Sequence, residues 1–148
     1  MILYLDTSAL VKLYIQEQGS EEVAAWVENA NPPVTSLITK VEAVAAFARA
    51  VRQGILRPEE TLSTLEELRA EWKHFVRVPI TEGLVASADT LAWRYELRGY
   101  DAIHLASALY WRDAIGADVT LATYGRELWH AARRAQLGIL PEGLGPAS

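Results

Sequence analysis

The strongest constraint on the fold is the alternation of short apolar segments with longer amphipathic ones. The short segments have the composition of buried strands, and they are Ile2 to Leu5 and parts of "ANPPVTSL", "FVRVPI" and "DVTLAT". The longer segments carry apolar residues at helical spacing, and they are Ser8 to Ile15, Glu21 to Asn29, "TKVEAVAAFARAVRQG", Pro58 to about Phe75, Glu82 to Leu97, Ala102 to Ala114 and "GRELWHAARRAQLG". This alternation predicts an α/β fold, in which a central parallel sheet has helices on both faces.

The chain is expected to form one domain. Its 148 residues suit a single hydrophobic core, and the sequence contains no internal repeat and no linker. We expect the domain to cover residues 1–138, with residues 139–148, "ILPEGLGPAS", as a carboxyl-terminal tail.

Composition excludes several classes of protein. There are no cysteines, so any metal has to be bound by oxygen atoms or by one of three histidines. No apolar run approaches the roughly 20 residues of a membrane span, and the amino terminus does not have the pattern of a signal peptide. We therefore expect a cytoplasmic protein without a membrane contact. The net charge of −5 argues against broad electrostatic adhesion to nucleic acid, although a local basic patch remains compatible with it.

Three acidic residues stand where expected helices begin. Asp6 directly follows the first strand, Glu42 lies in the first turn after the second, and Asp101 precedes "AIHLASALYW". Each could simply cap its helix, and Thr39 to Glu42 spells the T-x-x-E capping box. However, the carboxyl ends of parallel strands meet at one edge of a sheet, so Asp6 and Glu42 should converge there.

Carboxylates that converge repel one another unless they are protonated or share a cation. Ligation by oxygen alone selects hard ions such as Mg²⁺ or Mn²⁺. Such ions support phosphoryl transfer, because they activate water and stabilise charge on a phosphate. The sequence thus predicts metal-dependent phosphoryl transfer, with Asp6, Glu42 and Asp101 as both the catalytic and the metal-binding residues.

Four fragments in this order, "YLDTSALVKLY", "TSLITKVEAVAAFAR", "GYDAIHLASAL" and "LATYGRELWHAARRAQLG", resemble PIN-domain proteins of the VapC-type toxin family. The resemblance covers Ile2 to about Gly138. It implies a three-layer α/β/α sandwich and an endoribonuclease that depends on Mg²⁺ or Mn²⁺. It also implies a small antitoxin partner and a homodimer. The family's first three acids match Asp6, Glu42 and Asp101.

Around the acids, the resemblance also assigns supporting positions. Thr7 and Ser8 match the small hydroxyl residues after the first acid, and Thr123 could orient a water molecule. The family's usual Thr-x-Asp-Arg reads Thr123-Tyr124-Gly125-Arg126 in this chain, so the fourth acid is replaced by glycine. We expect weaker metal binding, or the loss of a second metal site, as the result.

Basic and aromatic residues suggest further contacts. Arg49, Arg126 and Lys12 could hold RNA phosphates, and Arg49 shares a helix face with Glu42. The alternative for these residues is an ordinary solvated charge. His104 could be a metal ligand or a general base, but burial in the core or behind the site is the favoured interpretation. The five tryptophans are expected in the core or at an interface, and the helix from Pro58 to Phe75 is the candidate for partner docking.

Two alternatives to a nuclease remain open. The chain could be a PIN-like binding module with weak or no catalysis, because its fourth acid is missing. It could also be an aspartyl-phosphate enzyme, although "LDTSA" lacks the second aspartate that such enzymes use two residues after the first.

Overall fold

Five short strands form one parallel sheet in the computed structural model, which describes residues 1–144. Their order across the sheet is β3-β2-β1-β4-β5. The strands are β1 (Leu3–Leu5), β2 (Val34–Ser36), β3 (Val76–Val78), β4 (Thr120–Ala122) and β5 (Gly138–Leu140). The central strand β1 is fully buried, as expected for a parallel sheet covered on both faces.

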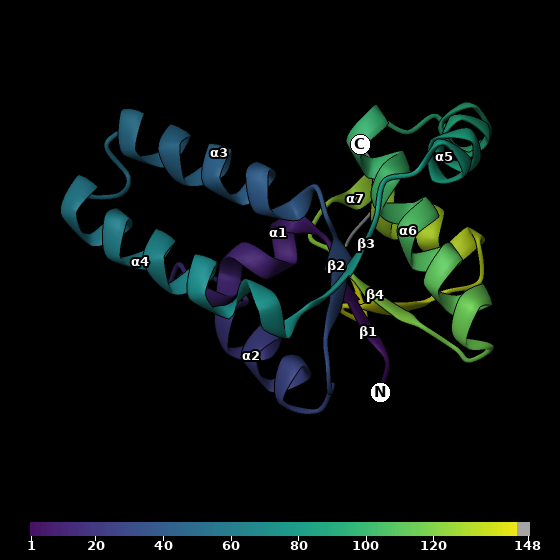
Figure 1. Cartoon of the computed structure of the whole chain (residues 1–148), viewed down its shortest axis with the longest axis horizontal. Coiled ribbons are helices and arrows are strands. Elements are labelled where there is room, and N and C mark those ends of the chain that lie inside the picture. Colours follow the sequence, from purple (N-terminus) through teal and green to yellow (C-terminus); the bar gives the residue numbers. More distant parts are fainter. Residues whose placement is uncertain (145–148) are drawn as a thin grey trace.

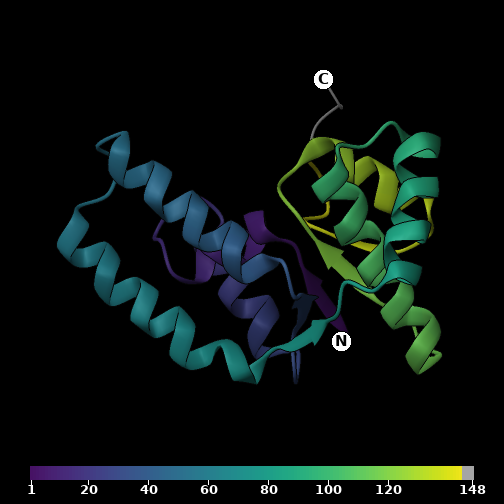
Figure 2. The same cartoon turned by 45° about the horizontal axis from the view of Figure 1, so that its top comes forward.

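Helices cover both faces of the sheet, so the molecule has the three layers of an α/β/α sandwich (Figure 1). On one face lie α1 (Thr7–Leu10), η1 (Val11–Leu13), α2 (Ser20–Glu28), α3 (Thr39–Arg52), α4 (Pro58–Glu71) and η2 (Trp72–His74). On the other face lie α5 (Glu82–Tyr95), α6 (Gly99–Ile115) and α7 (Arg126–Arg134). Figure 2 shows α3 and α4 as a long pair that reaches away from the sheet. The predicted fold class is therefore confirmed.

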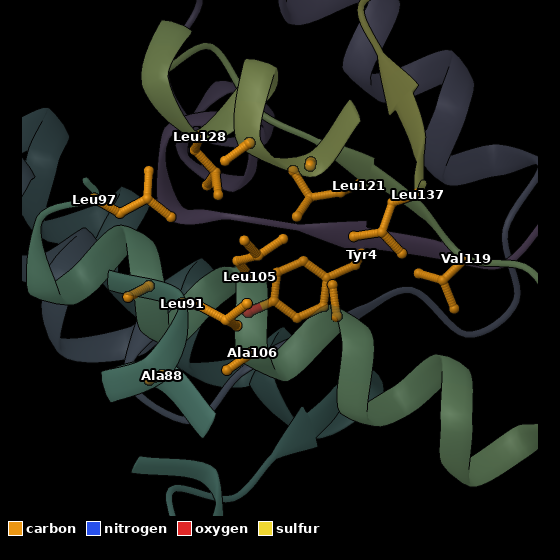
Figure 3. Close-up of a cluster of buried hydrophobic side chains, with 14 of the residues drawn as sticks. Tyr4, Ala88, Leu91, Leu97, Leu105, Ala106, Val119, Leu121, Leu128 and Leu137 are labelled. Atoms are coloured by element: carbon orange, nitrogen blue, oxygen red, sulfur yellow. The ribbon is translucent and has the colours of Figure 1, made fainter. Parts of the chain in front are cut away.

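Each face of the sheet has its own hydrophobic core. Side chains alternate between the two faces along a strand, so Leu3 and Leu5 point to one side and Tyr4 to the other. Leu3 and Leu5 belong to a buried cluster with Phe47 of α3. Tyr4 belongs to the opposite cluster, where its ring lies among side chains of α6 such as Leu105 (Figure 3). The core thus locks β1 in place, and β1 carries Asp6 at its carboxyl end.

One strand was not predicted from the sequence. β5 begins at Gly138, which pairs with Thr120 of β4. A Cβ atom at Gly138 would lie 2.6 Å from the Thr120 hydroxyl oxygen, so glycine permits this close strand approach. The first residues of the expected tail, Ile139 and Leu140, are therefore part of the sheet. The domain boundary at residue 138 stays a prediction, and residues 145–148 of the tail lie outside the described residues.

Two local expectations on helix bounds were wrong. The first helix is a single α-turn, Thr7–Leu10, followed by the 3-10 turn η1. The helix predicted to reach Phe75 ends at Glu71. Trp93 was expected in the core or at an interface; it is 87% exposed, so it does not pack in the core, and a place at an interface stays a prediction. None of the helices formed by residues 1–144 has the length and apolar character needed to cross a bilayer.

Candidate active site

All three predicted acids line one cavity. It has a volume of about 510 Å³ and lies where β1 and β2 end and α3 and α6 begin. The lining residues are Asp6, Thr7, Ser8, Val11, Glu42, Ala45, Ala46, Arg49, Arg98, Tyr100, Asp101, His104 and Gly125. Segments that are far apart in the sequence therefore meet here, as the topology predicts for the carboxyl edge of a parallel sheet.

Asp6 is held by three donors. Its Oδ1 atom accepts hydrogen bonds from the Ala9 backbone N–H at 2.9 Å and from the Ser8 hydroxyl at 2.7 Å. Its Oδ2 atom accepts a short hydrogen bond from the Thr123 hydroxyl. Asp6 is also the N-cap of α1. The capping role and a role in the cavity are thus compatible, because the same carboxylate can serve both.

Thr123 and Ser8 tie Asp6 to the segment between β4 and α7. The Thr123 hydroxyl directs its proton at Asp6 and accepts a hydrogen bond from the Gly125 N–H at 3.0 Å. The Ser8 hydroxyl accepts one from the Tyr124 N–H at 2.9 Å. The contact of Thr123 in this structure is therefore with the carboxylate, and the expected orientation of a water molecule by its hydroxyl has no separate support.

The Glu42 side chain bonds to residues of other elements and does not cap its own helix. Its Oε1 atom accepts hydrogen bonds from the Thr7 hydroxyl at 2.7 Å and from His104 Nε2 at 2.8 Å. Burial acts to raise the pKa of Glu42, but the hydrogen bonds from His104 and Thr7 outweigh burial and lower it. The T-x-x-E capping box is wrong, since Ile38 is the N-cap of α3 and the Thr39 hydroxyl contacts Thr35 instead.

Asp101 lies in the first turn of α6 and does not precede the helix, which begins at Gly99. It is nearly buried, and its Oδ2 atom lies 3.5 Å from the guanidinium of Arg98. Burial raises the pKa of Asp101, the charge of Arg98 opposes that rise, and the charge of Asp6 adds to it. The carboxylates of Asp6 and Asp101 are thus close enough to repel each other, which a shared cation would relieve.

The donor set suits a hard cation, but it is not a preformed cage. The side chains of the three acids offer only carboxylate oxygens, the ligands that Mg²⁺ and Mn²⁺ prefer. Across residues 1–144, however, no three His, Asp or Glu side chains gather closely enough to hold an ion by themselves. Mg²⁺ commonly keeps several water molecules, so a cation in this cavity would reach at least one of the acids through water.

Among the expected basic residues, only Arg49 reaches the cavity. Lys12 is engaged elsewhere: its Nζ atom pairs with Glu17 at 3.0 Å and lies 4.4 Å from the centre of the Tyr124 ring. Arg126 is exposed, donates to the Leu144 carbonyl and does not line the cavity. The expected roles of Arg126 and Lys12 in RNA binding stay predictions, since neither residue lines the cavity.

Two lining residues with polar side chains, Arg98 and Tyr100, were not predicted from the sequence. Arg98 contacts Asp101, and its guanidinium also lies 4.8 Å from the ring centre of Tyr100. The signal for Arg98 in the sequence is its position three residues before Asp101, since Arg98 is the N-cap of α6 and Asp101 lies in the first turn. His104, by contrast, lies as the favoured interpretation placed it, buried behind the acids.

The sequence and the fold together define the family of this chain. The PIN domain family matches residues 3–134, and the chain belongs to that family. Two curated relatives are Ribonuclease VapC45 and Ribonuclease VapC49 of two Mycobacterium tuberculosis strains, CDC 1551 / Oshkosh and ATCC 25618 / H37Rv. Each is 32% identical over 146 residues, which is 98% of this chain and 99% of the relative. The predicted relationship to VapC-type proteins is confirmed.

Solved structures share the fold at lower identity. A structure of FitAB bound to a DNA fragment, IR36, matches with a TM-score of 0.67 at 17% identity and covers 94% of both chains. A toxin-antitoxin complex from Klebsiella pneumoniae matches with a TM-score of 0.64 at 20% identity, covering 95% of this chain and 96% of that one. These likenesses confirm the α/β/α architecture.

Proposed function

We propose that this protein is an endoribonuclease that depends on Mg²⁺ or Mn²⁺ and serves as the toxin of a toxin–antitoxin pair. The observation that carries the proposal is the meeting of Asp6, Glu42 and Asp101 in one cavity, at the sheet edge where this topology collects its functional residues. The names of the curated relatives, Ribonuclease VapC, support RNA as the substrate. Membership of the PIN family argues against the aspartyl-phosphate alternative.

In the proposed mechanism, Asp6, Glu42 and Asp101 hold the cation. The ion, when bound, supplies an activated water molecule and neutralises charge on the scissile phosphate. Ser8 and Thr123 orient the Asp6 carboxylate through their hydroxyl protons, and Thr7 does the same for Glu42. Arg49 neutralises a flanking phosphate at the cavity wall. No side chain of the protein needs to act as a nucleophile.

Removing the metal is the first test. Purified protein incubated with single-stranded RNA and millimolar Mn²⁺ is expected to cleave it internally, and excess chelator is expected to stop cleavage. Returning Mn²⁺ should restore it. Gel analysis of end-labelled RNA reports the products. Cleavage at an undiminished rate in chelator would contradict the metal-dependent mechanism.

A binding module without catalysis is the second candidate. Two observations favour it: Gly125 stands in place of the fourth acid, and the acids are not gathered into a preformed cage. Calorimetric titration with Mg²⁺ separates the two candidates. Saturable binding supports the enzyme, whereas no binding up to tens of millimolar supports the inert module.

Arg49 gives a test of RNA binding that does not depend on cleavage. Replacing Arg49 with alanine is expected to raise the Kd for a labelled RNA about tenfold in the presence of chelator, the loss of about 1.4 kcal/mol of a charged contact. The slope of log K against log salt should fall by about one. Arg52→Ala is the matched control, because Arg52 is exposed on the same helix but lines a different cavity. Equal effects of both substitutions in fluorescence anisotropy would contradict the assignment.

The partner is proposed to dock along α3 and α4. A cavity of about 320 Å³ between these helices has a mostly apolar lining, and Leu62 beside it is 63% exposed. Exposed apolar surface of this kind is typical of protein interfaces. The Klebsiella pneumoniae match is described as a toxin-antitoxin complex, which supports a small antitoxin as the occupant. Co-purification with the product of a small adjacent reading frame tests this partner, and the homodimer and cytoplasmic location stay predictions.

A further inference from the structure

A hydrogen-bonded chain of three side chains runs from the core to the cavity. It starts at the hydroxyl of Tyr4 on β1, passes through the ring of His104 on α6 and ends at Glu42 on α3. The Tyr4 hydroxyl lies 2.8 Å from His104 Nδ1, and His104 Nε2 lies 2.8 Å from Glu42 Oε1. The Tyr4 and His104 rings also meet edge to face, with 5.9 Å between their centres.

Packing immobilises both Tyr4 and His104. Tyr4 has no exposed surface, and His104 is 1% exposed. Figure 3 shows the Tyr4 ring enclosed by apolar side chains of the sheet and of α6, including Leu105 and Leu121. The His104 ring is held firmly by this packing, so its Nε2 atom is directed at one point in space. That point is the Glu42 carboxylate.

The hydrogen-bond partners assign the protons along the chain. An ionised carboxylate only accepts, so His104 Nε2 has to donate to Glu42 Oε1. The Tyr4 hydroxyl lies 2.8 Å from Nδ1 and can donate its proton to that nitrogen. The tautomer with its proton on Nε2 can donate to Glu42 and accept from Tyr4 on Nδ1, so it gives all three groups a hydrogen-bond partner. The other donor to Oε1 is Thr7, from the turn that follows Asp6.

We propose that His104, itself held by Tyr4, is a positioning residue that fixes the orientation of Glu42 in the active site. The proposal rests on the proposed function, because it gives His104 a role through a residue assigned to the cation. His104 contacts neither substrate nor cation in this account. It determines which oxygen of Glu42 is occupied and which is turned towards the cavity. Hydrogen-bonded partners of ligands commonly contribute 10- to 100-fold to metal affinity or activity, and we expect about that for His104.

The first test needs no metal and no activity. The imidazole ¹⁵N–¹H spectrum of labelled protein in chelator reports which ring nitrogen carries the proton, and loss of a signal in His104→Asn identifies His104. We expect protonation on Nε2, with a resonance that shifts in Glu42→Gln. Protonation on Nδ1 alone would overturn the proposal, because that tautomer has no proton to donate to Glu42.

A pair of matched variants then tests the consequence for catalysis. Glutamine places an amide near Nε2 and keeps a donor for Glu42, whereas asparagine reaches only the position of Nδ1 and keeps the contact with Tyr4. We expect His104→Asn to lower kcat about 10- to 100-fold and His104→Gln to retain most of it, with similar Tm values for both. If His104 had only a structural role, kcat would fall in both variants in step with the loss of Tm.

The outcomes separate this inference from the proposed function. If the wild-type protein does not cleave RNA, the nuclease proposal fails, and the tautomer alone decides whether His104 orients Glu42. If the wild-type protein cleaves and His104→Asn cleaves equally fast, the positioning role is wrong while the nuclease proposal stands.

Discussion

Replacing Asp6 with asparagine is expected to reduce RNA cleavage more than about a hundredfold while leaving the fold intact. The effect should exceed the one expected for His104, because Asp6 would bind the cation itself, whereas His104 only positions a ligand. Asparagine caps helices as well as aspartate does, so α1 keeps its N-cap. The amide also fits between the hydroxyls of Ser8 and Thr123, which can each donate or accept. The change thus removes the charge and little else.

The measurement compares cleavage in Mn²⁺ with the thermal unfolding midpoint. Asp101→Asn is expected to behave like Asp6→Asn. Asp118→Asn is the matched control, since Asp118 is an exposed acid at the opposite end of β4. Survival of wild-type cleavage in both Asp6→Asn and Asp101→Asn would show that the acids are not the metal ligands. Asp6→Ala, in contrast, should also lose about 1 kcal/mol of stability with the cap.

Introducing an acid at Gly125 is expected to strengthen metal binding. Gly125 has an extended backbone with φ −85° and ψ 120°, which any residue adopts. A Cβ atom there would meet only the Thr123 hydroxyl oxygen, at an ordinary contact distance of 3.5 Å. Gly125→Asp therefore fits without backbone strain, and an additional carboxylate at the cavity should lower the Kd for Mn²⁺ about tenfold, since ligand charge sets affinity.

Calorimetric Mn²⁺ titration of Gly125→Asp and Gly125→Asn gives the comparison, because the two side chains have the same shape and differ in charge. Without metal, the new carboxylate repels Asp6, so Gly125→Asp should gain more thermal stability from Mn²⁺ than the wild type does. Equal affinity in the two variants would mean that position 125 lies outside the metal site, and that the glycine does not explain weak binding.

The sequence predicts most of the fold because its signals are local. Buried strands such as Ile2 to Leu5 are nearly continuous apolar runs, and the helices between them have clear periodicity. β5 escapes prediction because it begins with Gly138, whose role depends on the distant Thr120. The exposure of Trp93 also escapes prediction, because helical spacing does not say which face of α5 is covered.

The candidate site is also predictable only where its signals are local. Asp6, Glu42 and Asp101 are predictable because each stands near the start of a helix, and the sheet topology then collects them. Two of the contacts that orient them join residues far apart in the sequence: His104 and Glu42 are separated by 62 positions, and Thr123 and Asp6 by 117. No short-range pattern encodes such pairs. The residues from Thr39 to Glu42 match the T-x-x-E sequence of a capping box, but Glu42 bonds to the distant His104 and does not cap its helix.

The central claim is that Asp6, Glu42 and Asp101 share one divalent cation, and crystals soaked in Mn²⁺ test it most directly. We expect an anomalous difference peak within the cavity, beside Asp6 and Asp101, with Glu42 reaching the ion through water. A peak elsewhere, or none at millimolar Mn²⁺ in a protein that cleaves RNA, would contradict it.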